Sequence, residues 1–434
     1  MTAWQPYKPN EAAPWNARRV VHLHRRTVFG PTWNEVQRDL ADSPENAVNR
    51  ILDGECRAAG VPSDFETLSE LIGNSATTSR NADRIKAWWI YRCLLSPDPL
   101  RERLTLMWHS HFATSNLKVG NLQQMMAQND TLRRHSRDSF RDLLKAMLQD
   151  PALLIWLDAP GNRKGYPNEN LARELMELFT LGIGHYSEDD VKQAARALTG
   201  LTVHNGAFRL HVSRHDAEAK TVLGQTDNID ADQLTEILLK HPATAQRLAW
   251  RLTQEFFGEG VVGEAELAEL VQQLQKSNLN IGTAVETILH SELFFSEANI
   301  RSRVCDPLSF LIAPLRAFEM CQRPPSTLLL ANWLQRMGLD LFYPPNVGGW
   351  DGGRTWLNTR TVIARANYAA AAVHGELSQP AALRDLKTLA AKHGSKSYAQ
   401  FVETLFAFDP GTVPTKTETE TFVNLMSQPT AHLH

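Results

Sequence analysis

The sequence predicts a mainly α-helical fold, a large multi-helix domain that carries a small antiparallel β-hairpin insertion. Two observations predict the helices: helix-start signals recur along the chain, and apolar residues repeat at the three-and-four spacing of an amphipathic helix. One observation predicts the hairpin, because the dipeptide Asn205-Gly206 stands between two stretches in which apolar and polar residues alternate.

The composition narrows the class of protein. The chain has 434 residues, of which 43% are hydrophobic and 21% are charged, as in a globular protein with a large core. The net charge of -3 gives no overall field that would attract nucleic acid or an anionic membrane. No run approaches the roughly 18 to 20 apolar residues that cross a bilayer, and the first residues lack the apolar core of a secretory signal. We therefore expect a cytoplasmic protein with no membrane span and no nucleic-acid partner.

The helices are predicted from their start signals and their apolar faces. Three signals place a hydroxyl three residues before a carboxylate, as a capping box does: Thr32 with Glu35, Ser63 with Glu66, and Ser187 with Asp190. Three more place a capping side chain before a proline at the first helical position: Ser43-Pro44, Asp98-Pro99 and Asp150-Pro151. Apolar residues at helical spacing predict further helical turns over 140–148 and 191–198.

The predicted hairpin pairs residues 201–204 with 207–212, and a third short strand is expected at 221–223. No linker rich in Gly, Ser or Pro divides the chain. We predict an extended N-terminal arm over 1–17, a helical domain over 18–372 with the hairpin at about 201–224, and a C-terminal helical extension over 373–434. The cysteines, which lack a two-residue spacing, argue against a zinc knuckle or a disulfide scaffold.

The segment 167–184, PNENLARELMELFTLGIG, holds the most informative polar residues. On a helix, Asn170, Arg173, Glu174 and Glu177 form one narrow stripe opposite an apolar side, and Glu169 lies beside it. One interpretation is a solvated face with an Arg173–Glu177 pair worth only ~0.3–0.5 kcal/mol. The other is a buried polar patch, whose carboxylates hold a metal or act as acid and base.

A second cluster is MWHSHF at 107–112. On a helix that begins at Pro99, His111 lies on the apolar face and His109 lies on another face. A metal shared by both histidines requires the helix to end before His109, because only an extended segment points them the same way. The alternative is a buried imidazole that is hydrogen-bonded to a backbone carbonyl.

Two further segments supply candidate residues. His215 and Asp216 lie in a turn-rich connection after the hairpin, where functional side chains often project, although Asp216 capping a polar loop is the alternative. Trp350 lies in a loop rich in Pro and Gly, and the helix predicted over 356–367 carries Arg365. Aromatic residues on such a loop suit a sugar or peptide groove. A tryptophan that anchors the loop to the core is the alternative.

The same motifs resemble one known family. They are HLHRRTVFGPT at 22–32, MWHSHFATS at 107–115, NENLARELMELFTLGIGHYSEDDVKQAARALTG at 168–200, RHDAEAKTVLG at 214–224, HPATAQRLAWRL at 241–252, and PPNVGGW followed by WLNTR from 344. Together, in this order, they resemble the bacterial family called domain of unknown function 1800, over roughly residues 18–372. The resemblance implies a mostly helical fold and a bacterial source. It also implies a neighbouring gene for a sulfatase-like protein, and hence a partner.

Two functions are expected. The first is an enzyme whose site combines the polar stripe with His109 or His111 and the His215 loop, either with a divalent metal or by metal-free acid–base chemistry. The second is a non-catalytic helical partner or maturation factor for the sulfatase-like protein, in which the stripe fixes helix packing. For the enzyme, the candidate catalytic residues are Glu174, Glu177, Arg173, His215 and Asp216, the candidate metal ligands are His109, His111 and Glu169, and the candidate substrate-binding residues are Asn170, Trp350 and Arg365.

Overall fold

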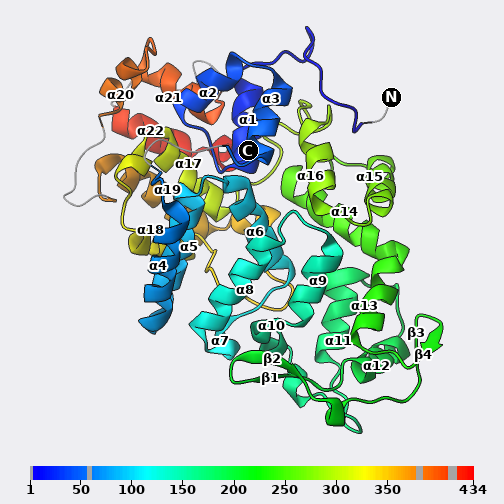
Figure 1. Ribbon diagram of the computed structural model, residues 1–434. Coiled ribbons are helices and arrows are strands. Elements are labelled where there is room, and N and C mark those ends of the chain that lie inside the picture. The colour runs from blue at the N-terminus through cyan, green and yellow to red at the C-terminus, as the bar shows by residue number, and fades with distance from the viewer. Residues whose placement is uncertain (1–2, 56–60, 378–384, 409–417) are drawn as a thin grey trace.

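The computed structural model describes residues 3–55, 61–377, 385–408 and 418–434 (Figure 1). These residues form α-helices joined by short loops, with two small antiparallel sheets of two strands each. The predicted fold class, mainly α with a small hairpin insertion, is therefore confirmed.

The first half of the chain is almost entirely helical. Its α-helices are α1 (Ala17–Thr27), α2 (Trp33–Leu40), α3 (Pro44–Leu52), α4 (Phe65–Thr78), α5 (Ala82–Leu95), α6 (Pro99–His111), α7 (Asn116–Val119), α8 (Leu122–Arg134), α9 (Phe140–Leu148), α10 (Pro151–Trp156), α11 (Asn170–Glu174) and α12 (Glu188–Ala197). A π-helix, η2 (Leu175–Thr180), continues α11, and a 3-10 turn, η1 (Ala159–Gly161), follows α10.

After the strands the helices resume. They are α13 (Ala231–Lys240), α14 (Pro242–Phe256), α15 (Glu264–Lys276), α16 (Ile281–His290), α17 (Pro307–Ala317), α18 (Thr327–Arg336), α19 (Thr359–His374), α20 (Leu386–Lys392), α21 (Tyr398–Phe406) and α22 (Glu418–Met426). The 3-10 turns are η3 (Val212–Arg214), η4 (Met320–Gln322), η5 (Gly353–Trp356) and η6 (Pro429–His432). α19 runs across the boundary predicted at residue 372.

The predicted start signals set most of the corresponding helix ends. Thr32 and Ser187 each form a complete capping box, in α2 and α12. Ser43, Asp98 and Asp150 each cap a helix whose first residue is the following proline. The expected start at Ser63 is wrong by one residue, because Asp64 holds the N-cap position of α4.

The hairpin forms where the sequence predicts it, in a shorter version. β1 (Leu201–His204) pairs with β2 (Ala207–Leu210), with His204 opposite Ala207. Asn205 and Gly206 have φ of 49° and 78°, the two positive values that the tight turn needs. The third strand, β3 (Lys220–Val222), pairs instead with β4 (Gln225–Asp227) across a second two-residue turn. The insertion is thus two separate hairpins, and β4 was not expected.

Replacing Gly206 by valine is expected to destabilise the β1–β2 hairpin by roughly 1–2 kcal/mol, because a β-branched residue is strained at positive φ. The cost is conformational rather than steric, since a Cβ at this position meets only the Nε2 atom of Gln124, at 4.0 Å. Hydrogen exchange of the amides in both strands measures the loss of protection. Ala207→Val, which leaves the turn intact, is the control, and equal protection in the two variants would contradict the assignment.

Two hydrophobic cores lie on either side of α6. One contains Trp108 of α6 with the buried side chains of α9 to α16, and the other is built from α1, α5 and α17 to α22. Figure 1 shows α6 and α8 in the middle of the molecule, between the side formed by α4, α5 and α18 and the side formed by α9 to α16. The N-terminal arm packs on the first core, where the Trp4 indole donates to the Glu266 carbonyl. The chain ends beside α1, where the Cys305 amide donates to the His432 carbonyl.

Cys93, Cys305 and Cys321 are buried thiols without disulfides, and Cys56 lies outside the described residues. Among the described helices, none combines the length and the apolar character that crossing a bilayer requires.

Candidate functional site

The first half of the polar stripe forms ion pairs at the surface. The Arg173 guanidinium donates to Glu169 at 3.0 Å and to Glu188 at 2.8 Å, and its side chain is 34% exposed. Asn170, one turn earlier, donates from Nδ2 to Asp158 at 3.1 Å. Arg173 therefore pairs with Glu169 and Glu188 rather than with Glu177, and this end of the stripe matches the solvated interpretation.

The second half of the stripe, Glu174 and Glu177, is half-buried. The Tyr186 hydroxyl donates to Glu177 Oε2 at 2.8 Å. Burial and the neighbouring Glu177 carboxylate raise the pKa of Glu174, although Arg173 opposes them. Glu174 and Glu177 thus form a partly buried carboxylate pair, an arrangement that suits one of them to carry a proton.

His111 binds the end of the helix that carries this carboxylate pair. Its Nε2 atom lies 3.1 Å from the Phe179 carbonyl, and Arg247 Nε donates to the adjacent Leu178 carbonyl at 3.3 Å. Burial and the nearby arginines, Arg251 and Arg247, hold the pKa of His111 well below its ordinary value, so the ring is neutral and donates. His111 therefore satisfies a free carbonyl at the end of η2, as the backbone-bonded alternative predicted.

His109 lies on another face of α6, among aromatic rings. Its ring packs against Trp89, Phe342 and Trp350, with centroids 5.3 to 5.7 Å away. Burial alone lowers its pKa to about 3. α6 continues through His111, so the extended geometry that a metal shared by the two histidines requires is absent, and that condition of the metal hypothesis fails. Within the described ranges, no three His, Cys, Asp or Glu side chains are grouped as a metal ion would need.

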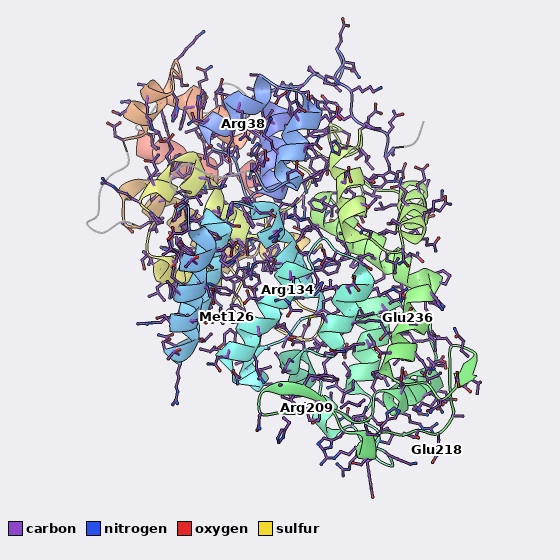
Figure 2. All side chains as sticks on the ribbon, in the orientation of Figure 1. Arg38, Met126, Arg134, Arg209, Glu218 and Glu236 are labelled. Carbon is purple, nitrogen blue, oxygen red and sulfur yellow. The ribbon has the colours of Figure 1, made fainter. Side chains whose placement is uncertain are left out.

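The loop after the hairpin is tied to α12. Asp216 accepts from Arg196 Nε at 2.7 Å, and the His215 ring lies 3.0 Å, at Nδ1, from the Thr199 carbonyl. The ion pair lowers the pKa of Asp216. Figure 2 shows Glu218 of this loop and Arg209 of β2 at the hairpin end of the molecule. His215 lines a cavity of about 320 Å³ there, and no contact joins it to the polar stripe or to the α6 histidines within the described structure.

Trp350 and Arg365 have different surroundings. Trp350 lines a cavity of about 490 Å³, and its backbone amide donates to Ser110 Oγ at 3.3 Å. Arg365 is fully buried in α19, where its guanidinium donates to the Cys305 carbonyl at 2.8 Å and lies over the Phe310 ring. The predicted site residues therefore occupy several separate places, and of them only Trp350 is among the residues that line the cavity of about 490 Å³.

The cavity of about 490 Å³ beside Trp350, which we call the α14 cavity, lies between α6, α14, the segment 302–306 and the loop 350–356. Its apolar wall includes Met107, Phe257, Val304, Leu339, Trp350 and Trp356. Its polar wall includes Ser110, Arg251, Gln254, Glu255, Arg303 and Asp306. Apolar walls with a few converging polar groups are typical of sites that bind small molecules.

The carboxylates of the α14 cavity are held by arginines. Glu255 contacts Arg103 at 2.9 Å and Arg303 at 3.4 Å, and Asp306 contacts the same arginines at 3.5 and 3.7 Å. Asp306 also caps α17, since it accepts from the Ser309 amide. These cations and hydrogen bonds lower the pKa of Asp306 in spite of its burial, so the carboxylate stays ionised.

The charged residues that line the α14 cavity were not predicted from the sequence. A signal for them exists, because Arg247, Arg251 and Glu255 recur every four residues along the segment that forms α14. Arg303 has no such signal, since most of its partners, among them Gln254, Glu255 and His434, lie about fifty residues away or further along the chain.

The comparisons with known proteins give one family. The profile described as "Protein of unknown function (DUF1800)" matches residues 22–432, nearly the whole chain and well beyond the residues whose motifs suggested it. No curated protein and no solved structure matches this chain. With most of its length matched, the chain belongs to the DUF1800 family.

Proposed function

We propose that this protein binds a small organic molecule in the α14 cavity. One observation carries the proposal: a cavity of about 490 Å³ combines an aromatic and aliphatic wall with ionised side chains. Such a volume lies within the range of small-molecule sites, roughly 300–1,000 Å³. The proposal keeps Trp350 as a ligand-binding residue, as the sequence suggested.

The loop that carries Trp350 is built to stay close to α6. Gly349 has φ of 81°, and a Cβ there would lie 2.2 Å from the Ser110 carbonyl oxygen. Only glycine permits that approach. The Trp350 amide then reaches the Ser110 hydroxyl, and its ring packs against His109 behind it. The tryptophan is therefore held in place as part of the cavity wall before any ligand arrives, which lowers the entropic cost of binding.

Replacing Gln254 by tryptophan is expected to block ligand binding, because this exposed side chain lines the α14 cavity and a bulky ring would fill its mouth. The measurement is a ligand-observed NMR screen of neutral and anionic aromatic fragments against the parent and the variant. Gln246→Trp is the matched control, since Gln246 is exposed on the same helix and does not line the cavity. Fragments that bind the parent and the control, but not Gln254→Trp, support the proposal. Fragments that bind all three proteins equally, or none at all, refute it.

The Glu174–Glu177 pair supports a second candidate function, acid–base catalysis without a metal, with Glu174 as the proton carrier and His215 and Asp216 outside the site. The raised pKa of Glu174 is the observation that favours it. The Glu177 carboxylate, which accepts from the Tyr186 hydroxyl, is one of the two causes that raise this pKa, the other being burial.

Glu174→Gln is expected to raise the melting temperature at neutral pH. A carboxyl whose pKa is raised by folding stabilises the folded state at low pH, and that stability is lost as the pH rises. The ionised Glu174 is therefore unfavourable at pH 7, and glutamine removes its charge. Melting temperatures of parent and variant at pH 7 and at pH 4 measure the effect, which should shrink at pH 4. Since Arg173 is already paired with Glu169 and Glu188, a marked loss of stability at pH 7 would contradict this view of Glu174.

The alternative of a partner or maturation factor for a sulfatase-like protein stays a prediction of the family resemblance. Ligand binding in the α14 cavity does not exclude binding to such a protein. Size-exclusion chromatography of the two purified proteins, mixed and separate, measures whether they form a complex.

A further inference from the structure

We infer that the ligand of the α14 cavity carries an oxyanion, either a carboxylate or a phosphate. Arg251 binds this oxyanion, and Arg303 lies beside it. This inference rests on the proposed function and names the chemical class of its ligand. It follows from the balance of charged side chains around the cavity, from the hydrogen bonds that these side chains make, and from the position of Arg251 on the cavity wall.

Arginines outnumber carboxylates around the inner end of the cavity. Among the described residues, six arginine side chains lie near two carboxylates, Glu255 and Asp306. The net charge of this group is positive, and it stays positive if a terminal carboxylate at His434 is added. The arginines are Arg25, Arg26, Arg103, Arg251, Arg303 and Arg365. Electrostatic contacts link Arg26 to Arg25, Arg103 and Arg303, and link Arg251 to Arg303. The cluster is therefore a connected group of cations, in which Arg25, Arg26, Arg103 and Arg365 are buried, Arg251 and Arg303 are half-buried, and Arg365 is linked to the others through Asp306.

The two carboxylates are already occupied. Arg103 and Arg303 hold both of them. Among the described residues, no carboxylate lies within ion-pair distance of Arg251 or Arg26, although the charge of Glu255 acts on both arginines from further away. Arg251 donates only to the Met107 carbonyl, at 2.9 Å, and Arg26 donates to Asn299 and to Ser302.

Several guanidinium nitrogens in this cluster are buried without an acceptor. They are Nε of Arg251, Nε and Nη1 of Arg26, Nε of Arg103, and Nε and Nη1 of Arg365. A buried donor without a partner costs about 1–3 kcal/mol, and more when it is charged. An oxyanion offers several acceptor lone pairs at once and offsets that cost. The cluster is thus unsatisfied in hydrogen bonds as well as in charge.

Arg251 connects this cluster to the cavity. It lines the α14 cavity together with Arg303 and Ser302, and Ser302 also accepts a hydrogen bond from the fully buried Arg26. Burial lowers the pKa of Arg251 to about 10, against the opposing effect of the Glu255 carboxylate, and the positive charges of Arg247 and Arg303 act in the same direction as burial. An anion beside Arg251 would reverse that shift.

The carboxylates at the mouth of the cavity do not occupy the position beside Arg251 that the oxyanion of the ligand would take. Glu259 pairs with Arg354 at 3.2 Å, and both side chains are largely exposed. Asp351 is exposed on the loop 350–356. Water and salt screen exposed charges much more than buried ones. The buried end of the cavity therefore determines the charge of the ligand.

The inference is tested with oxyanions as probes on the full chain. Melting temperatures are measured against increasing sodium phosphate, sodium malonate or sodium chloride at constant ionic strength. Phosphate or malonate is expected to raise the melting temperature in a saturable manner, and chloride is not. A response to phosphate alone identifies a phosphate-bearing ligand, and a response to malonate alone identifies a carboxylate-bearing one. If neither oxyanion shifts the melting temperature, the inference is wrong.

Arg251→Met is expected to weaken that response by roughly tenfold to a hundredfold, the loss of a charge-assisted hydrogen bond. Its melting temperature without added oxyanion should equal or exceed that of the parent, because a buried cation without a carboxylate is removed. Arg247→Met is the matched control: Arg247 lies one turn earlier on α14 and does not line the cavity, so its loss removes the same charge and should weaken the response far less than Arg251→Met does. If Arg251→Met fails to fold, Arg251→Lys replaces it, with a weakened response expected because lysine keeps the charge and loses the planar fork.

Two results would overturn the inference and leave different conclusions. An oxyanion response that is the same in Arg251→Met and in the parent would place the anion elsewhere on the surface. Neutral fragments that bind the parent and are blocked by Gln254→Trp, in a protein that does not respond to oxyanions, would keep the proposed ligand site and reject its anionic ligand. Failure of the fragments and of the oxyanions together would reject both proposals.

Discussion

Replacing Glu102 by glutamine is expected to lower the free energy of unfolding by about 3–5 kcal/mol, the cost of breaking a buried ion pair from one side. The Glu102 carboxylate is completely buried in α6. It accepts from Arg92 of α5 at 2.9 Å and from Arg133 of α8 at 2.8 Å. Glutamine keeps the shape of the side chain and removes its charge, so both arginines lose their buried counter-ion. Denaturant unfolding of parent and variant measures the difference.

Glu66→Gln is the matched control. Glu66 pairs with the same Arg92, at 2.9 Å, but its side chain is 66% exposed. An exposed pair contributes about 0–1 kcal/mol, because water and salt screen it. Equal losses of stability in the two variants would show that burial does not control the strength of this network. The ion pairs of Glu102 with Arg92 and Arg133 also affect the α14 cavity, because they hold α6 in place and Met107 and Ser110 of α6 line that cavity.

The sequence predicted those parts of the fold that depend on near neighbours. The capping boxes at Thr32 and Ser187 and the turn at Asn205-Gly206 need only residues within a few positions, and all three form. β4 was missed for a related reason. Its residues Gln225–Asp227 are polar and exposed, so no alternation of apolar and polar side chains reveals the strand.

The structure around the polar stripe could be predicted only in part. The helical spacing placed Asn170 and Glu177 on one side, but it gave no sign of the π-helix that begins at Leu175. Two free carbonyls at the end of that π-helix are bound by His111 and Arg247, from helices far away in the sequence. Spacing along one helix contains no information about such partners.

The α14 cavity could not be predicted from the sequence either, because its contacts join residues that are far apart along the chain. Arg26 finds its partners at Asn299 and Ser302, more than 270 residues along the chain. A run of charged residues such as His24-Arg25-Arg26 in α1 is typical of a solvated helix face, but in this structure both arginines are buried. Trp350 was identified because its loop of prolines and glycines is a local pattern, and its position against Ser110 depends on the glycine beside it.

Replacing His109 by phenylalanine is expected to make the protein more resistant to acid. Burial lowers the pKa of His109 to about 3 from its ordinary value of 6.5, so the unfolded chain binds this proton more readily than the folded protein does. The stability that the neutral ring provides is complete above pH ~6.5 and is lost as the pH falls toward 3. At pH 5 the loss is ~2 kcal/mol, from ~1.4 kcal/mol per pH unit. Phenylalanine preserves the contacts with Trp89, Phe342 and Trp350 and cannot be protonated.

The free energy of unfolding is measured for parent and variant between pH 7.5 and 4.5. The two curves should converge at the upper end and separate below pH ~6.5, with the variant more stable. His211→Phe, at an exposed position after β2, is the control and should follow the parent. Other buried histidines, such as His22 and His111, titrate in both proteins, so the difference between the curves isolates His109. Parallel curves would contradict the buried neutral ring. A metal that purifies with the parent and is lost from His109→Phe would instead make His109 a ligand, because a ring that only packs against other rings has no metal to release.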